Sequence, residues 1–422
     1  PYTPLFRSVG LSFVQYPEPD ENVWHGKPCV VAPHPGDWHW GADAYRRLLK
    51  GEEISNPPPE PEGFSGFAGL AAHYDFQYQN GGIVHTFKDI PGLCEEALKD
   101  GFAHLLLAGW HEDGFDNGFP KYRPAACLGG EAELREAVAR AHALGVQILF
   151  YVNVRLCNAK YGDCEALIRD AAVMDDGGSL CVESYGDDRM RFATMCSAAT
   201  AWQDRMADTM AYLKEAVDAD GAYLDQLSLA PGKLCRHPGH GAKRAGWNLG
   251  YEAMLEKIRA RLAGRPFLLL DEGCCDRLGA ALDGQLTAML GRVDSGAFPE
   301  MYRYTFPHQP LLEMMNPASS VMRCPRLGRL SAALLMRAFI LGQYLWVYDL
   351  EEDNTFRADG EERAFLHKVV SLRRAWLRAY GPGRFLDDRG MAFPAGSLMA
   401  GGVEAKLFGL RDGLLIAAAN PA

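Results

Sequence analysis

The stretch DGAYLDQ, residues 220–226, decides the fold prediction for this chain. It predicts a short buried strand that carries the carboxylate of Asp225 at its C-terminal end. Apolar side chains at helical spacing between residues 202 and 217 predict a helix before it, and residues 218–221 form the connecting turn. A helix, a tight turn, a strand and a terminal acid are typical of barrel enzymes, whose catalytic residues lie at the C-terminal ends of parallel strands.

The same alternation of helix and strand recurs along the chain. Helices are predicted at residues 91–99, 131–144 and 248–263, the last with Asn248 as its N-cap. Strands are predicted at residues 82–86, 103–109, 146–152, 221–224 and 267–270, with weaker patterns at 293–298, 319–322 and 344–348. Eight strands alternating with helices predict a (β/α)8 TIM barrel, and an open doubly wound sheet is the alternative that periodicity leaves.

Two segments mark the predicted limits of the barrel. The proline-rich stretch NPPPEPEG, residues 56–63, predicts a linker, because consecutive prolines fit neither a helix interior nor a central strand. From Met391 onward, short apolar runs separated by glycine turns predict antiparallel strands. We therefore predict an N-terminal segment at 1–63, the remnant of a β domain, a barrel at 64–385, and the start of a C-terminal β-sandwich at 386–422.

Composition narrows the class of protein. With 422 residues, 48% of them hydrophobic, the chain is predicted to be globular. A net charge of −11 without a basic cluster argues against nucleic acid and anionic membranes as partners. Apolar runs are too short for a membrane span. The 11 scattered cysteines indicate reduced thiols and a cytoplasmic location, and secretion stays an alternative because residue 1 is not Met. The sequence predicts no oligomeric state.

Polar residues follow nearly every predicted strand. Each alone could cap the next helix or bond its own turn, but the convergence of acids with Trp and Asn favours a functional site. Carboxylates flanked by aromatic rings are what glycoside cleavage needs, so we expect a carbohydrate substrate and no cofactor. Tyr151 and Tyr223 are predicted to pack in the core. The candidate substrate-binding residues are Trp38, Trp110, His111, Asp116, Asn153, Arg155, Gln226, His237, His240, Asp271, Glu300 and Arg303.

A separate cluster, CRHPGH at residues 235–240, brings a thiol and two imidazoles close together, as zinc sites do. A tetrahedral site needs a fourth ligand, and Pro238 with Gly239 indicates a stiff loop. The preferred interpretation is a substrate-contacting loop, so no metal is predicted.

Several segments, taken in order, resemble a known family. They are DWHWGADAYRRL from Asp37, FKDIPGLCEEALKDG, HLLLAGWHEDGFDNGFPKY, LGGEAELREAVARAHALGVQILFYVN, DADGAYLDQ and LLLDEGCCD. They look like the glycoside-hydrolase-like barrels of the DUF6259 family and, more distantly, the endo-α-N-acetylgalactosaminidase and α-galactosidase barrels. The resemblance covers roughly residues 37–310.

This resemblance implies roles for the acids. In the related barrels the nucleophile is an Asp at the end of the fourth strand, which corresponds to Asp225. The acid/base comes from the end of the fifth or sixth strand, where Asp271, Glu272, Asp294 and Glu300 are candidates. Glu272 is preferred, because the following glycine lets the backbone turn so that the side chain points inward.

The implied activity is a retaining glycosidase that acts on α-linked glycosides by double displacement. Carboxyl groups about 5 Å apart would support retention, and about 7–9 Å would favour inversion. Tyr223 replaces a Lys of the α-galactosidase pattern, which speaks against α-galactoside specificity. The alternatives are a non-catalytic carbohydrate-binding barrel and a metal-dependent barrel hydrolase that uses His237, His240 and nearby acids.

Overall fold

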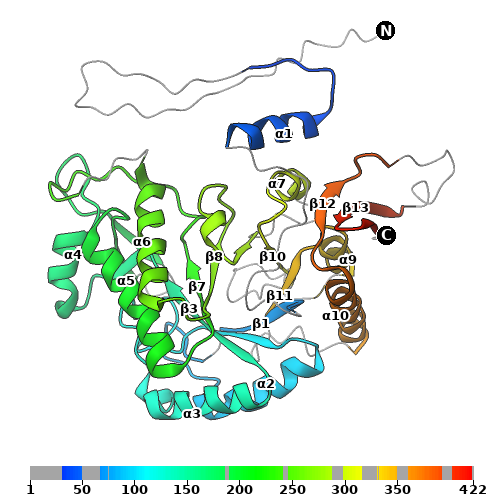
Figure 1. The fold of residues 1–422 in the computed structure, drawn as a ribbon. Coiled ribbons are helices and arrows are strands. Elements are labelled where there is room, and N and C mark those ends of the chain that lie inside the picture. The colour runs from blue at the N-terminus through cyan, green and yellow to red at the C-terminus, as the bar shows by residue number, and fades with distance from the viewer. Residues whose placement is uncertain are drawn as a thin grey trace, which may run out of the picture.

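Eight parallel strands form a closed barrel in the computed structural model of the chain (Figure 1). The structure describes residues 31–49, 67–74, 76–185, 190–240, 246–287, 298–315, 330, 332–348, 360–391 and 402–420. In order around the barrel the strands are β1 (Gly69–His73), β2 (His104–Leu107), β3 (Gln147–Asn153), β7 (Gly221–Asp225), β8 (Leu268–Glu272), β9 (Gly284–Leu286), β10 (Leu311–Met314) and β11 (Tyr344–Tyr348). Parallel pairing of β11 with β1 closes the ring, so the barrel is confirmed over an open sheet.

The first strand was predicted in the wrong place. The barrel begins with β1, whereas residues 82–86 form a loop with one isolated bridge from Ile83 to Gln77. The segment GLAAH lacks the β-branched and aromatic residues that mark strands. Its small residues are required by close packing, because a Cβ on Gly69 would lie 2.2 Å from the carbonyl oxygen of Leu345 on β11.

The sixth and seventh strands also differ from the prediction. They are β9 and β10, three and four residues long, and too short to show a pattern in the sequence. Residues 319–322, and 293–298 apart from Phe298, lie outside the described residues. The second, third, fourth, fifth and eighth strands are confirmed.

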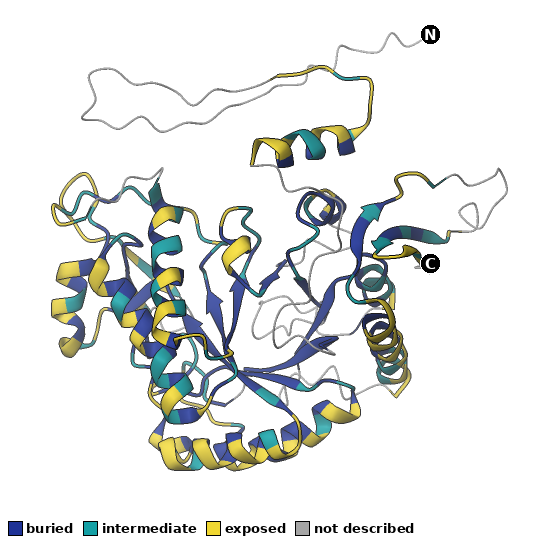
Figure 2. Cartoon of the chain, viewed as in Figure 1, coloured by how far each residue is buried: buried dark blue, intermediate teal, exposed yellow. Residues whose placement is uncertain are grey.

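Helices flank the barrel, with buried faces toward the strands and exposed faces outward, while the first helix, residues 38–48, lies above the barrel (Figure 1 and Figure 2). The described helices are α1 (Trp38–Leu48), α2 (Ile90–Lys99), α3 (Gly130–Ala143), α4 (Glu165–Ala171), α5 (Thr200–Tyr212), α6 (Trp247–Leu262), α7 (Pro299–Thr305), α9 (Ala332–Ile340) and α10 (Gly360–Tyr380). The four predicted helices are confirmed as α2, α3, α5 and α6. The predicted cap of α6 is wrong, because Gly246 precedes the helix and Asn248 lies inside it.

Two small antiparallel sheets extend the barrel. One has the order β4-β6-β5, with β4 (Leu156–Asn158), β5 (Val182–Tyr185) and β6 (Met190–Thr194), and interrupts the chain between β3 and α5. The other joins β12 (Arg384–Asp387), β13 (Glu404–Leu410) and β14 (Gly413–Ala419) near the C-terminus and packs on α7 and α9. The predicted C-terminal antiparallel strands are therefore confirmed, and the domain limits at 63/64 and 385/386 stay predictions.

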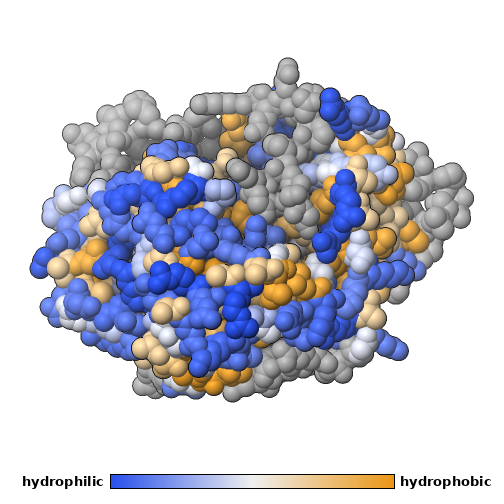
Figure 3. Space-filling view, turned by 60° about the horizontal axis from the view of Figure 1, so that its bottom comes forward, coloured by the Kyte–Doolittle hydropathy of each residue, from blue (hydrophilic) through white to orange (hydrophobic). Residues whose placement is uncertain are grey.

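The surface of the molecule is mainly hydrophilic on the face shown in Figure 3, with hydrophobic patches between the hydrophilic regions. None of the described helices combines the length and the apolar character that a membrane crossing requires.

Candidate functional site

A cavity of about 480 Å³ opens where the barrel strands reach their C-terminal ends. This is the end at which barrel enzymes place their active sites. The lining residues come from strand ends and from the loops that follow them. They are Tyr74, Phe115, Asp116, Tyr151, Arg155, Glu183, Tyr185, Tyr223, Asp225, Gln226, Leu229, Ala230, Pro231, Lys233, Glu272, Met314 and Tyr348.

Asp225 and Glu272 are the last residues of β7 and β8, neighbouring strands of the barrel. Both carboxyl groups line the cavity. Two neighbouring carboxyl groups repel each other when both are charged, so each makes ionisation of the other less favourable.

Two donors from the neighbouring strand β3 hold Asp225. The Tyr151 hydroxyl donates to Oδ2 at 2.5 Å, and the Asn153 side-chain amide donates to the same oxygen at 2.6 Å. The barrel register places them there, because Tyr151 pairs with Tyr223 and Asn153 with Asp225. Burial raises the pKa of Asp225, while the hydrogen bonds from Tyr151, Glu272 and Asn153 favour its ionised form.

Glu272 keeps the proton of the pair. Burial and the charge of Asp225 raise the pKa of Glu272 to about 9, and its hydrogen bond to Asp225 adds to this rise. The Gln226 backbone N–H donates to Glu272 Oε2 at 3.1 Å and fixes the carboxyl group. Gly273 has φ +91°, and a Cβ there would lie 3.0 Å from the backbone nitrogen of Leu229. Only glycine fits this turn without strain.

A third carboxyl group, Asp116, lies on the same cavity. Burial, with the charge of Asp225 as the second cause, raises the pKa of Asp116 to about 7. The Tyr151 hydroxyl, which donates to Asp225, also lies 3.5 Å from Asp116 Oδ1. Asp116 is therefore placed to respond to the charge of the carboxyl pair.

The cations on the cavity wall are paired with an acid of the protein. Arg155 donates to both carboxylate oxygens of Glu183, at 2.9 and 2.5 Å, and Lys233 lies 2.7 Å from Glu183. Although burial alone would raise it, hydrogen bonds from Arg155, Lys233 and Tyr185 hold the pKa of Glu183 well below its usual range. Arg155 also donates to the side chain of Gln226 at 3.0 Å. Its guanidinium thus orders the wall next to Asp225.

Aromatic rings form much of the remaining wall. Tyr74 contacts Phe115 and Tyr348, with ring centroids 5.0 and 5.2 Å apart, and Phe115 lies 5.2 Å from Tyr151. Tyr151 and Tyr223 are buried, as predicted, yet both also line the cavity. An apolar face of this kind can pack against the C–H groups of a sugar ring.

Several predicted site residues lie behind the cavity. Trp110 is fully buried and donates through Nε1 to the backbone oxygen of Tyr151 at 3.0 Å, so it supports the cavity wall from beneath. His111 is buried against Phe119 and Tyr122. Asp271 is fully buried and binds Ser228, because successive side chains of a strand point to opposite sides and Glu272 takes the cavity side.

Other predicted site residues belong to different parts of the fold. Trp38 packs on Tyr304, and Glu300 forms ion pairs with Arg337 and Lys406 of the C-terminal region. Arg303 donates to the backbone oxygens of Leu341 and Pro307. His237 and His240 stack on each other in the loop after β7, with ring centroids 4.0 Å apart. None of these five lines the cavity, and Asp294 lies outside the described residues.

Lining residues that the sequence analysis missed come from two sources. Tyr74 and Tyr348 follow or end barrel strands, so correct assignment of β1 and attention to the aromatic end of β11 would have found them. Glu183, Tyr185 and Lys233 lie in the inserted sheet or in the loop after β7, where the sequence carries no positional signal.

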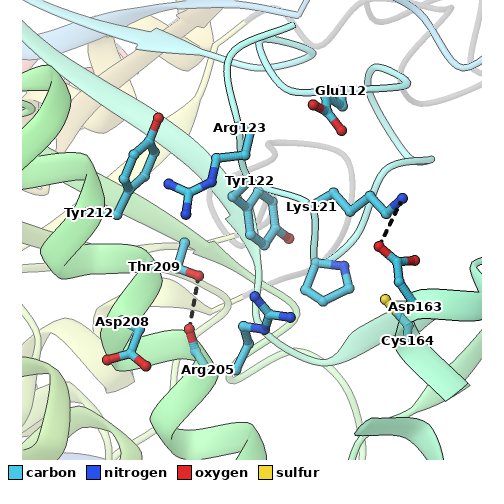
Figure 4. Close-up of a pocket in the computed structure, with 11 residues that line it drawn as sticks. Glu112, Lys121, Tyr122, Arg123, Asp163, Cys164, Arg205, Asp208, Thr209 and Tyr212 are labelled. Atoms are coloured by element: carbon cyan, nitrogen blue, oxygen red, sulfur yellow. Dashed lines mark hydrogen bonds and ion pairs between the residues drawn. The ribbon is translucent and has the colours of Figure 1, made fainter. Parts of the chain in front are cut away.

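A second cavity of about 260 Å³ lies apart from the carboxyl pair, between α5 and the loop that contains residues 112–123 (Figure 4). Its charged groups largely satisfy one another or nearby residues. Lys121 pairs with Asp163 at 3.3 Å, Asp208 pairs with Arg261, and the Arg123 guanidinium stacks on the Tyr212 ring. None of the predicted site residues lines it, so the larger cavity is the candidate active site.

The sequence model of the family described as "Domain of unknown function (DUF6259)" matches residues 84–297, half of the chain. No curated protein matches the sequence. Among solved structures, the ligand-free α-N-acetylgalactosaminidase NagBb from Bifidobacterium bifidum is similar over 91% of this chain, with a TM-score of 0.67 and 16% identity. The chain spans 62% of that protein's length.

Two further solved structures are similar. A variant of the GH36 α-galactosidase AgaA from Geobacillus stearothermophilus matches 90% of this chain and 50% of its own, with a TM-score of 0.60 and 13% identity. The α-amylase from Geobacillus thermoleovorans matches 85% of this chain and 87% of its own, with a TM-score of 0.56 and 12% identity. At these identities the similarity establishes the barrel fold.

Proposed function

The chain belongs to the DUF6259 family, and we propose that it is a glycoside hydrolase that cleaves α-linked glycosides with retention of configuration. One observation carries the proposal. Asp225 and Glu272 face the same cavity from neighbouring strand ends, where the pKa of Glu272 is raised to about 9 and hydrogen bonds from Tyr151 and Asn153 favour the ionised form of Asp225. A protonated acid beside an ionised nucleophile is the division of roles that glycoside cleavage requires.

The separation of the pair supports retention. Inverting enzymes hold their carboxyl groups about 6.5–9.5 Å apart, because a water molecule must fit between the base and the sugar. Asp225 and Glu272 end adjacent strands and each shifts the pKa of the other, which favours the shorter separation. In retaining enzymes that separation is roughly 5–5.5 Å.

In the first step, Asp225 Oδ attacks the anomeric carbon and forms a glycosyl ester, while the bond to the leaving oxygen breaks. Glu272 gives its proton to that oxygen. In the second step, the ionised Glu272 takes a proton from water, and the water oxygen attacks the anomeric carbon and releases the Asp225 carboxylate. Tyr151 and Asn153 orient the carboxylate throughout, because both donate to it.

The wall of the cavity and the similar structures support the proposed substrate class. NagBb was solved with GalNAc, and AgaA with raffinose, and both are named as α-glycosidases. The aromatic rings around Tyr74 offer this chain a comparable sugar-binding surface. We therefore propose an α-linked hexoside, with α-N-acetylgalactosaminides first to be tested.

The test is a screen of aryl α- and β-glycosides in which NMR follows the anomer released first. Retention on an α-glycoside gives the α-anomer first, whereas an initial β-anomer contradicts the mechanism. Asp225→Asn should abolish turnover, because an amide cannot form the glycosyl ester. Glu272→Gln should lower kcat by about 10²–10⁴-fold for poor leaving groups and much less for activated aryl groups. Sugar binding without turnover in the unaltered protein would instead indicate a carbohydrate-binding barrel.

A further inference from the structure

Three metal-ligating side chains meet outside the cavity, at the contact between the inserted sheet and the loop that follows β7. Cys196 follows β6, while Cys235 and His240 belong to the loop after β7. One ligand atom from each residue lies within 4.8 Å of the other two, and the two cysteines are buried. Cys196 is 39 positions before Cys235 along the chain, so the tertiary fold brings the two sides of the group together.

The histidine of this group has the tautomer that a metal ligand needs. His240 Nε2 lies 2.9 Å from the backbone oxygen of Asp170, which can only accept, so Nε2 carries the proton. Nδ1 therefore has a free lone pair, and it lies 3.4 Å from Cys235 Sγ. Metal-binding histidines typically donate their other ring nitrogen to a carbonyl or carboxylate in this way.

The spacing fits a tetrahedral zinc ion. Zn–S bonds of about 2.3 Å and Zn–N bonds of about 2.0–2.1 Å at tetrahedral angles separate sulfur from nitrogen by about 3.6 Å. The separation of 3.4 Å between Cys235 Sγ and His240 Nδ1 is close to that edge. Thiolate and imidazole ligands together favour zinc over magnesium or calcium, which prefer oxygen.

We propose that Cys196, Cys235 and His240 bind a structural zinc ion. The fourth position is taken by water, because the group brings together three ligand atoms. The sequence alone favoured a substrate-contacting loop for residues 235–240, because Cys196, which supplies the third ligand atom, is distant along the chain.

The ion would fasten two walls of the candidate active site to each other. The loop after β7 carries Lys233, and the inserted sheet carries Glu183, and these two line the cavity as an ion pair of 2.7 Å. The backbone N–H of Arg236 also donates to the backbone oxygen of Met174 at 2.8 Å, so the loop after β7 also contacts the chain between α4 and β5. A bond through zinc would hold this contact in place independently of any catalytic step.

The test uses the full chain, purified without a polyhistidine tag and dialysed against zinc-free buffer. We expect about one zinc per chain by elemental analysis. Replacement by Co²⁺ should give the strong near-ultraviolet thiolate-to-metal band and the intense visible bands of tetrahedral cobalt. Removal of the metal by a chelator should lower Tm, and added Zn²⁺ should restore it. These readouts do not depend on glycosidase activity, so failure of the zinc proposal and failure of the proposed function are distinguishable.

Variants locate the ion. Cys235→Ser and His240→Gln should each lower the bound zinc at least tenfold. His240 is partly exposed, so His240→Gln should disturb folding less than the change at the buried Cys235. Cys157→Ser is the matched control, because Cys157 is also a buried thiol next to another cysteine, Cys164, and lies outside the group. Cys181→Ser should leave the cobalt spectrum unchanged, because Cys181 lies outside the group.

Three results would overturn the proposal. The first is a folded protein that binds less than about a tenth of an equivalent of zinc after zinc is added. The second is a Cys196–Cys235 disulfide, detected by mass spectrometry in protein purified under reducing conditions. The third is retention of the metal in both Cys235→Ser and His240→Gln.

Discussion

Replacing Tyr151 by Phe should shift the pH dependence of activity in a direction that the geometry fixes. The Tyr151 hydroxyl donates to Asp225 Oδ2 at 2.5 Å inside a buried site. This hydrogen bond stabilises the ionised carboxylate, so its loss raises the pKa of Asp225. Since Asp225 must be ionised to attack, the acidic limb of the activity profile should move to higher pH.

The size of the shift follows from the strength of the bond. A hydrogen bond to a charged group contributes about 1.5–3 kcal/mol. One pKa unit corresponds to about 1.36 kcal/mol, so the acidic limb should move up by about 1–2 units. Below the limb, kcat/KM should therefore fall by about 10–100-fold relative to the unaltered protein, and above the limb it should largely recover.

The assay is kcat/KM for an aryl α-glycoside across pH, which reports the ionisations of the free protein. Tyr122→Phe is the matched control, because its hydroxyl donates to the backbone oxygen of Asn153 at 2.7 Å and makes no hydrogen bond to Asp225. An acidic limb that stays in place in Tyr151→Phe, with an unchanged far-ultraviolet CD spectrum, would refute the assignment of Asp225 as the ionised partner.

Activity should be lost as pH rises through the pKa of Glu272, about 9, and this basic limb should be absent from the residual activity of Glu272→Gln. Glu183→Gln should lower the free energy of unfolding by about 3–5 kcal/mol in urea denaturation, because it leaves the Arg155 guanidinium, 2% exposed, without its bidentate partner. Gly273→Ala should lower both kcat and Tm, since the added Cβ meets the Leu229 backbone at 3.0 Å and φ is +91°.

Matched variants separate these effects from general damage. Asp208→Asn removes an exposed ion pair with Arg261 and should change the free energy of unfolding by less than about 1 kcal/mol. A similar cost for Glu183→Gln would contradict the role of the buried pair. Gly264 has φ +75°, but a Cβ there would meet no atom within 4 Å. The loss of Tm in Gly264→Ala therefore measures the cost of the backbone conformation alone. If Gly273→Ala lowers Tm no more than Gly264→Ala does, the contact with the Leu229 backbone does not contribute to the loss of stability.

The elements that the sequence located correctly are those with a strong local pattern. The α3 helix has one buried apolar stripe, and β7 is a buried run between two turns, so each can be recognised without knowledge of the rest of the fold. The first strand was predicted in the wrong place because the small residues of GLAAH are required by close packing against β11, a contact between residues about 275 positions apart. Short strands such as β9 were not predicted, because three residues are too few to show the alternation of buried and exposed positions.

The site residues were likewise predicted correctly in part. Asp225, Glu272 and Gln226 were chosen by their place at strand ends, and the structure brings all three to the cavity. Trp110 was chosen by the same rule and lies behind the wall, because which side of the barrel a side chain faces depends on the exact residue at which the strand ends. Strand boundaries are the least certain feature of any sequence pattern.

The sequence by itself determined the alternation of helices and strands and the acids that end the fourth and fifth strands, because both follow from interactions between near neighbours along the chain. Tertiary structure alone decided that these acids face one cavity, that Tyr151 and Asn153 hold one of them, and that Glu183 and Lys233 complete the wall. The physical reason is distance: burial and charge interactions act through space, and barrel closure and loop paths set those distances.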